Sequence, residues 1–200
     1  DQDVKAGAWS RAEQFCLLNH PIMELAGKTL GLIGHGDLGR EVARLAEALG
    51  MQVLVAESFR RHGGQSGRVA LAELLPQADV LSLHCPLTAQ TDKLVNASFI
   101  AQMKPGAFLI NTARGGLIDE PALADALRSG HLGGAGLDVL SSEPPPVDHP
   151  LLAADIPNLI ITPHNAWGTR ECRQRLLDGV VENIRQWQAG SAINVVNASP

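Results

Sequence analysis

Short apolar runs alternate with amphipathic stretches along most of the chain. The six runs are rich in Val, Ile and Leu, and they are residues 29–33, 52–56, 80–84, 107–111, 134–139 and 159–162. Each run is almost continuously apolar, which is typical of strands that are covered on both faces, as in a parallel sheet. The pattern therefore predicts six strands of a buried parallel sheet.

Helical spacing of apolar residues fills the stretches between these runs. One apolar helical face follows the first run and is made by Leu38, Val42, Leu45 and Leu49, with Gly50 suited to cap the helix end. The other helices that we predict are residues 96–103, 120–129 and 169–189. Alternating strands and helices with short links predict an α/β fold built on a doubly wound parallel sheet of the Rossmann type. Ligands of such sheets bind at the carboxyl ends of the strands.

The composition excludes several classes of protein. The chain has 200 residues, 45% of them apolar and 18% charged, which suffices for a substantial core in one domain or two. A formal net charge of -5 argues against a nucleic-acid partner. Neither a membrane span nor a signal peptide is visible, so we expect a soluble, cytoplasmic protein. Cys16, Cys85 and Cys172 are far apart and outside any C-x-x-C spacing, which argues against a disulfide framework and a metal site.

A glycine-rich loop links the first predicted strand to the first predicted helix. Its sequence is Gly34-His35-Gly36-Asp37-Leu38-Gly39, a G-x-G-x-x-G motif. The first glycine permits the tight turn, the second lets the backbone approach a pyrophosphate, and the third lets helix and strand pack closely. Because the helix N-terminus also offers free N–H groups to a phosphate, the loop predicts a dinucleotide site.

The second predicted strand ends close to an acidic residue, Glu57, 18 residues after Gly39. A carboxylate there accepts hydrogen bonds from the ribose hydroxyls of NAD and repels a 2'-phosphate, so NAD is favoured. Arg60 and Arg61 follow this strand, and an arginine in that place can receive a 2'-phosphate. NADP therefore stays open as the less favoured cofactor.

Polar residues with catalytic potential follow three successive strands. Arg114 follows the fourth predicted strand, Asp138 and then Glu143 follow the fifth, and His164 follows the sixth. A guanidinium can bind a carboxylate through two parallel hydrogen bonds, and a histidine can exchange a proton near neutral pH. Because the carboxyl ends of parallel strands share one edge of the sheet, we expect these side chains to face one crevice.

Several segments resemble the D-isomer-specific 2-hydroxyacid dehydrogenases in order and spacing. They are residues 30–39, 83–88, 103–107, 111–119, 137–139 with 143–144, and 162–164. The resemblance extends from about residue 5 to residue 190. Within this family, residues 143–146, 151–158 and 164–168 are most similar to glycerate dehydrogenases, also called hydroxypyruvate reductases.

The resemblance implies hydride transfer between NAD(H) and a short 2-keto or D-2-hydroxy acid, namely hydroxypyruvate and glycerate, with glyoxylate as a further candidate. Arg114 would bind the substrate carboxylate, His164 would be the acid and base, and Glu143 would hydrogen-bond His164 and favour the protonated imidazole. The implied cofactor contacts are Gly34, Gly36, Asp37, Leu38, Gly39, Glu57, Cys85, Pro86, Thr91, Thr112, Ala113, Arg114, Asp138, His164, Ala166 and Trp167. Among them, Asp138 would hold the nicotinamide carboxamide.

The resemblance also implies a division of the chain. Residues 28–168 would form the NAD-binding Rossmann domain, residues 1–27 a helix and loop connecting it to a substrate domain, and residues 169–200 a C-terminal helix and tail. The chain opens at Asp1 and lacks most of the family's substrate domain, so we expect it to bind NAD(H) but to turn over poorly alone. A homodimer through the cofactor domain is expected.

Two other functions stay open. One is a glyoxylate/hydroxypyruvate reductase that prefers NADP. The other is a binding module that senses NAD(H) without catalysis, since one branch of this superfamily consists of transcriptional corepressors and keeps the Arg, Glu and His.

Overall fold

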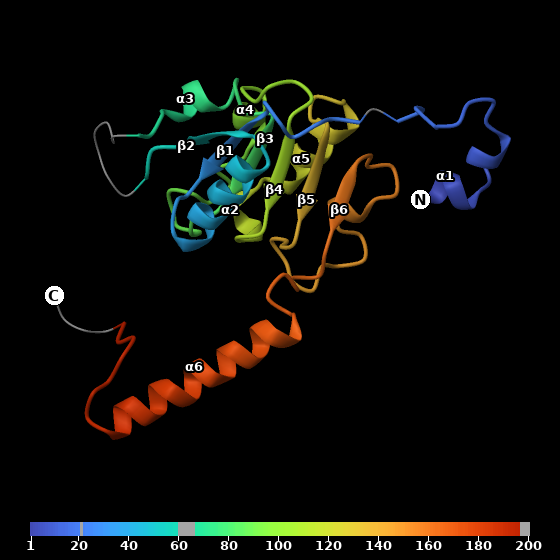
Figure 1. The fold of residues 1–200 in the computed structure, drawn as a ribbon. Coiled ribbons are helices and arrows are strands. Elements are labelled where there is room, and N and C mark those ends of the chain that lie inside the picture. The colour runs from blue at the N-terminus through green and yellow to red at the C-terminus, as the bar shows by residue number, and fades with distance from the viewer. Residues whose placement is uncertain (21, 60–66, 197–200) are drawn as a thin grey trace.

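A single parallel sheet organises the part of the chain that the structure, a computed structural model, describes, namely residues 1–20, 22–59 and 67–196 (Figure 1). Its strand order is β2-β1-β3-β4-β5-β6. The strands are β1 (Thr29–Ile33), β2 (Gln52–Val55), β3 (Val80–Leu83), β4 (Phe108–Asn111), β5 (Gly134–Leu137) and β6 (Leu159–Ile161). Each lies within one of the predicted runs, so the predicted doubly wound α/β sheet is confirmed.

In the described chain, four helices connect strands of the sheet and two more lie in the terminal segments. They are α1 (Gln2–Lys5), α2 (Asp37–Ala48), α3 (Leu71–Leu74), α4 (Ala97–Ile100), α5 (Glu120–Arg128) and α6 (Arg170–Gln188). Short 3-10 turns occupy Trp9–Arg11, Gly115–Leu117 and Pro150–Leu152. The predicted helix 96–103 is shorter than expected, because beyond the first turn the chain leaves the helix and the Lys104 N–H bonds the carbonyl of Leu75. The one-turn helix α3 was not predicted.

The strand order changes direction next to β1. From β1 the chain passes through α2 to β2 on one side, and then returns to β3 on the other side of β1. The loops that leave β1 and β3 therefore diverge, and they open a crevice at the carboxyl ends of these strands, where ligands of doubly wound sheets bind. Gly34 and His84 are the first residues beyond the two strands.

The face by which α2 packs on the sheet differs from the prediction. The buried residues of α2 are Gly39, Ala43 and Ala46, whereas the expected apolar face is open, with Leu38, Leu45 and Leu49 exposed to 73%, 48% and 58%. The helix begins so close to the sheet that a Cβ on Gly39 would overlap the carbonyl oxygen of Gly34. Only small side chains fit under a helix that approaches so closely, so the leucine face turns outward.

The edge strand and the two terminal segments are less covered than the centre of the sheet. Ile160 of β6 is 70% exposed, so the expectation of cover on both faces is wrong for this strand. No residue of α6 is buried, and Figure 1 shows this helix projecting away from the sheet. Within the described residues, no helix has the length and apolar character to cross a membrane.

Candidate active site

The glycine loop has the local geometry that its three predicted roles require. Gly34 has a φ of +100°, and a Cβ there would lie 2.5 Å from the carbonyl oxygen of His84. Gly39 allows the close approach of α2 described above. At Gly36, the N-cap of α2, a Cβ would meet no atom within 4 Å. The space over Gly36 is therefore the place where the backbone can receive a pyrophosphate at the helix N-terminus.

A cavity of about 550 Å³ opens beside this loop at the switch point of the sheet. Six of the predicted cofactor residues line it, and they are Gly34, Gly36, Glu57, Cys85, Pro86 and Thr91. Its size lies within the range of cofactor sites. The cavity therefore has the size and the position expected for the dinucleotide, while the predicted contacts of Gly36 with the pyrophosphate and of Glu57 with the ribose stay predictions.

The loop that forms the far wall of this cavity is fixed by one buried hydroxyl. Thr91 is 2% exposed, and its Oγ1 donates to the carbonyl of Pro86 at 2.7 Å and accepts the N–H of Thr88 at 2.8 Å. Thr91 therefore shapes the wall through its contacts with the Pro86–Thr88 turn.

An arginine that sequence reasoning overlooked lines the same cavity. Arg68 donates from Nη1 to the carbonyl of Ala56 at 3.0 Å, next to Glu57 in the chain. The arginines singled out from the sequence, Arg60 and Arg61, lie outside the described residues. The backbone of Val69 pairs with the end of β2, and this pairing brings Arg68 to the cavity.

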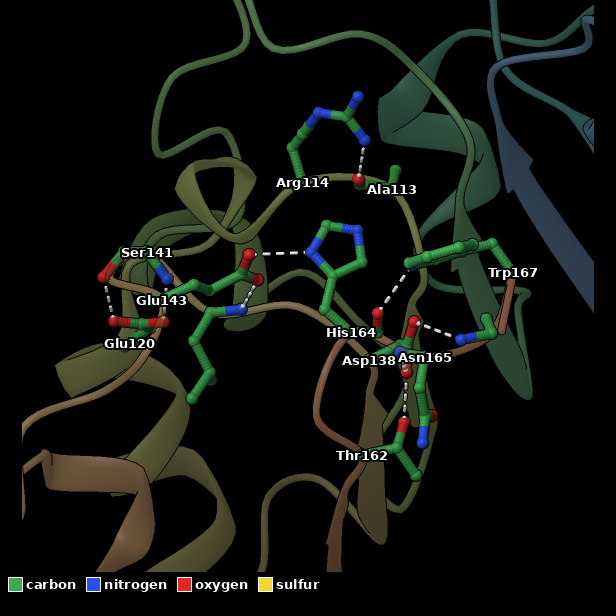
Figure 2. Close-up of polar contacts among 12 residues, drawn as sticks. Ala113, Arg114, Glu120, Asp138, Ser141, Glu143, Thr162, His164, Asn165 and Trp167 are labelled. Atoms are coloured by element: carbon green, nitrogen blue, oxygen red, sulfur yellow. Dashed lines mark hydrogen bonds and ion pairs between the residues drawn. The ribbon is translucent and has the colours of Figure 1, made fainter. Parts of the chain in front are cut away.

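The predicted contact between Glu143 and His164 is present (Figure 2). Nδ1 of His164 lies 2.7 Å from Oε2 of Glu143. The N–H of Leu140 donates to the other carboxylate oxygen at 2.9 Å. The hydrogen bond from His164 and then that from Leu140 hold the pKa of Glu143 below its usual value. An ionised Glu143 can only accept, so Nδ1 of His164 carries the proton and Nε2 is left for a substrate.

A buried carboxylate holds the turn that carries His164. Asp138 is 5% exposed, and it accepts hydrogen bonds from the Thr162 hydroxyl and from the N–H groups of Asn165 and Ala166, the latter two at 3.0 Å. Burial by itself raises the pKa of Asp138, but the Thr162 hydroxyl and the two N–H groups lower it below its usual value. The predicted contact of Asp138 with the nicotinamide carboxamide stays a prediction.

His164 itself occupies an uncommon backbone conformation. Its φ is +48°, in the left-handed region that non-glycine residues seldom adopt. The N–H of His164 donates to the Asp138 carbonyl at 2.8 Å, and Trp167 Nε1 donates to the His164 carbonyl at 2.9 Å. These contacts stabilise a backbone conformation that is unfavourable for a non-glycine residue by itself.

The turn that presents Arg114 is fixed by a fully buried amide. Asn111, at the end of β4, accepts the Ala113 N–H at 3.0 Å and donates to the Arg114 carbonyl at 2.9 Å. The guanidinium is exposed, and it donates to the Ala113 carbonyl at 2.7 Å. In Figure 2 the Arg114 side chain is drawn above the imidazole of His164. The sequence pointed to Arg114 but not to the supporting role of Asn111.

The remaining predicted cofactor residues lie at the surface around these two centres. In the glycine motif, Asp37 and Leu38 are both exposed, and Asp37 pairs with Arg40. The residues near the substrate end are exposed or half-buried, and they are Thr112, Ala113, Ala166 and Trp167. A ligand could therefore reach all of these residues. Exposure alone does not test the predicted contacts with the cofactor, which stay predictions.

A second cavity, of about 450 Å³, lies at the Glu143–His164 pair. Asp138, Glu143 and His164 are among the residues that line it. In the described part of the chain, no group of three or more His, Cys, Asp or Glu could hold a metal ion. An imidazole that is hydrogen-bonded to an ionised carboxylate can support proton exchange with a ligand in this cavity.

Comparison with known proteins gives the family. The model of the D-isomer specific 2-hydroxyacid dehydrogenase, NAD binding domain, matches residues 1–166. A glycerate dehydrogenase from Methylorubrum extorquens is 49% identical over 195 residues, which are 98% of this chain and 61% of that protein. A hydroxypyruvate reductase from Blautia hydrogenotrophica is 44% identical over 200 residues, 98% of this chain and 62% of that protein.

A solved structure agrees with these relatives. An acyclic imino acid reductase in complex with NADPH and D-Arg superposes with a TM-score of 0.80 at 34% identity, covering 98% of this chain and 62% of that one. The chain belongs to the D-isomer specific 2-hydroxyacid dehydrogenase family, and the resemblance predicted from its motifs is confirmed. It spans about three fifths of the length of these relatives.

Two glycine variants separate cofactor binding from folding. We expect Gly36→Ala to cost no more than about 1 kcal/mol of unfolding free energy, because the added methyl meets no protein atom and alanine is only a poorer N-cap than glycine. It should nevertheless weaken NADH binding at least about tenfold, since the methyl occupies the space needed by the pyrophosphate. Gly39→Ala is the matched control and should lose about 2 kcal/mol of stability through its clash with Gly34. Fluorescence titration with NADH and urea unfolding measure both; wild-type affinity in Gly36→Ala would contradict the assignment.

The Asp138 carboxylate should make stability depend on pH. Asp138→Asn replaces an acceptor by an amide that cannot satisfy all three donors, so we expect a loss of about 2–3 kcal/mol near neutral pH. Because the folded state lowers the pKa of Asp138, its contribution is present above the unfolded value of about 4 and is lost as pH falls through the lower folded value.

The difference between wild type and Asp138→Asn should therefore shrink in acid, as measured by urea unfolding from neutral to acidic pH. Thr162→Val, which removes one of the three donors, should cost less. A difference that stays constant down to the acid transition would refute the ionised state of Asp138.

Proposed function

We propose that the chain is the cofactor-binding and acid–base part of an NAD(H)-dependent oxidoreductase that interconverts a short 2-keto acid and its D-2-hydroxy acid. The observation that carries this proposal is the 2.7 Å contact between His164 and Glu143, at the strand ends that also present Arg114. The dinucleotide cavity opens at the same edge of the sheet. A bound nicotinamide supplies or accepts the hydride.

Arg114 binds the substrate carboxylate. Its guanidinium is exposed at the crevice and is oriented through the turn that Asn111 fixes. Two parallel N–H groups match the two oxygens of a carboxylate, which orients the neighbouring carbonyl. This arrangement supports a 2-keto acid as the substrate class.

His164 exchanges the proton. In reduction, Nε2 donates its proton to the carbonyl oxygen of the substrate as the hydride arrives at the carbonyl carbon, and the same nitrogen accepts the proton in the reverse direction. Glu143 accepts the Nδ1 proton of His164, which leaves Nε2 directed to the substrate. The pair therefore sets the orientation of the acid.

The substrate is proposed from the most similar relatives. Those described above are a glycerate dehydrogenase and a hydroxypyruvate reductase, which favours hydroxypyruvate and glycerate, with glyoxylate as a further substrate. NAD is the proposed cofactor, because Glu57 lines the cavity where it repels a 2'-phosphate. Arg68 on the same wall keeps NADP as the alternative, and one solved relative was determined with NADPH.

Hydride transfer tests this proposal. NADH oxidation should depend on hydroxypyruvate, should be slower with NADPH, and should fall at least about a hundredfold in His164→Ala because the general acid is lost. Absorbance of NADH measures the rate, in the chain and in any longer polypeptide that contains it. NADH titration is the control, and it should be little changed in His164→Ala. Tight NADH binding without any hydride transfer would instead favour an NAD(H)-sensing module.

The boundaries and the assembly are proposed on the basis of exposure. Residues 28–168 contain the whole sheet, whereas α6 has no buried residue. We therefore propose that residues 28–168 form the NAD-binding domain, flanked by residues 1–27 and 169–200.

Large apolar side chains of the first segment, residues 1–27, are open to solvent, with Phe15 at 90% and Leu18 at 75% exposure. Exposed apolar side chains of this size are typical of interaction surfaces, and on the first segment they support a homodimer. That the dimer forms through the cofactor domain is proposed from the family resemblance.

Sedimentation equilibrium tests the homodimer. We expect twice the chain mass of 21.2 kDa at micromolar concentration. Replacing Phe15 and Leu18 by Ser should shift the equilibrium toward the monomer without loss of NADH binding, because both lie outside the cofactor cavity. A wild-type chain that sediments as a monomer at all concentrations would exclude the dimer.

A further inference from the structure

A buried polar cluster lies behind the acid–base pair. Glu120, the first residue of α5, is 6% exposed, and His149 is 5% exposed. Nε2 of His149 lies 3.1 Å from Oε2 of Glu120. The N–H of Leu151 donates to the other ring nitrogen of His149 at 3.3 Å, so Nε2 carries the proton and donates to Glu120.

The same carboxylate binds the segment that carries Glu143. Ser141 donates to Glu120 twice, from its N–H at 2.8 Å and from its hydroxyl at 2.5 Å. Figure 2 shows Glu143 with His164 on one side and the Ser141–Glu120 contact on the other. Glu120 therefore receives three hydrogen bonds from a loop that follows it by 21 to 29 residues.

The placement of Glu120 suits an anionic anchor. It stands in the first turn of α5, where the positive end of the helix dipole favours a carboxylate. Residues 114–119 lead from Arg114 to Glu120. Within them, Gly115 packs so closely on the loop that carries Glu143 that a Cβ on it would overlap the carbonyl group of Leu140. The Arg114 turn and the Glu143 loop are thus packed together at Gly115 and hydrogen-bonded together at Glu120.

Regular secondary structure contributes little to the conformation of this loop. Between β5 and β6, the described chain forms only the 3-10 turn Pro150–Leu152, and Glu143 and Ser141 are exposed. The N–H of Leu140 is already used by the Glu143 carboxylate itself. The orientation of Glu143 therefore depends on the neighbouring Ser141 being held in place.

We propose that Glu120, with Ser141 and His149, forms a positioning group that keeps Glu143 within hydrogen-bond reach of His164. The proposal rests on the proposed function of the Glu143–His164 pair. Glu120 contacts neither substrate nor cofactor; it acts through the Ser141 backbone on the carboxylate that holds the imidazole. Loss of the anchor should lower the turnover number more than it changes the Michaelis constant, because the acid is misplaced while Arg114 remains.

The first test reads the pair directly by NMR. In the wild-type chain the ring nitrogen shifts of His164, read through its non-exchanging carbon-bound protons, should give a signal of a protonated Nδ1, which Glu143→Gln weakens or removes. Glu120→Ala should weaken or abolish that signal, and Ser141→Ala, which keeps the backbone donor, should change it less. The amide signals of Asn165 and Ala166, which Asp138 holds, should stay in place and so report that the β6 turn is intact.

Asp119→Ala is the matched control, because Asp119 is the adjacent carboxylate and caps α5 through the Ala122 N–H. It weakens the start of the helix without touching the Glu143 loop, so the His164 signal should persist. If Glu120→Ala does not fold, Glu120→Gln replaces it, since an amide keeps one acceptor for Ser141 but cannot satisfy all three donors. Loss of the signal in Asp119→Ala as well would reduce Glu120 to a general stabiliser of α5.

The second test is a double-mutant cycle on hydride transfer. Glu120→Gln should lower the turnover number about tenfold in the wild type, with the NADH dissociation constant unchanged, and should add little in the Glu143→Gln background. Additive effects would overturn the positioning role. If Glu143→Gln alone changes neither the signal nor turnover, the proposed function fails; if Glu143→Gln acts and neither Glu120 variant does, only the role of Glu120 fails.

Discussion

The register of the parallel sheet is the constraint on which the site depends. One row of paired residues crosses five strands, in the order Ile33, Leu83, Asn111, Leu137 and Ile161. The first glycine of the dinucleotide loop, Arg114, Asp138 and His164 all follow this row by one to three residues. A slip of a strand by one residue would reverse its two faces and displace the site residue that follows it along the edge. Backbone hydrogen bonds thus determine which side chains can meet.

The strands and the glycine loop could be predicted because their signals are local. A run of Val, Ile and Leu or the spacing of three glycines reports the structure of the same few residues. The outward face of α2 could not be predicted in this way. Its apolar periodicity favoured the leucines, but the distance between helix and sheet is set by Gly39 against Gly34, and that distance admits only Ala43 and Ala46. The apolar pattern therefore predicted the helix correctly, but a tertiary contact decided which of its faces is buried.

The polar groups of the candidate site could be predicted from the sequence, but their supports could not. Arg114 and His164 each follow a strand by three residues, and Glu143 lies on the connection after β5, which is visible in the sequence. Asn111, Asp138 and Glu120 hold these residues through hydrogen bonds to backbone groups, and the partners of Glu120 lie 21 and 29 residues away. No periodicity or motif of a single segment encodes such a pairing. Arg68 was missed for a similar reason, because only the pairing of Val69 with the end of β2 brings it to the cavity.

Asn111, Asp138 and Glu120 bind segments that differ in how much the sheet already limits their motion. Asn111 and Asp138 stand at strand ends, so the sheet already limits the motion of the turns that they bind. Glu143 instead lies on a long, proline-rich connection with little regular structure, and such segments open locally at a lower free energy than a core strand does. An ion pair that is about two-fifths exposed on both sides adds little stability of its own. The arrangement of this loop must therefore come from buried groups. The buried carboxylate of Glu120, which receives three hydrogen bonds from Ser141 and His149, is a polar one among them, beside the buried side chains of Leu140 and Leu151.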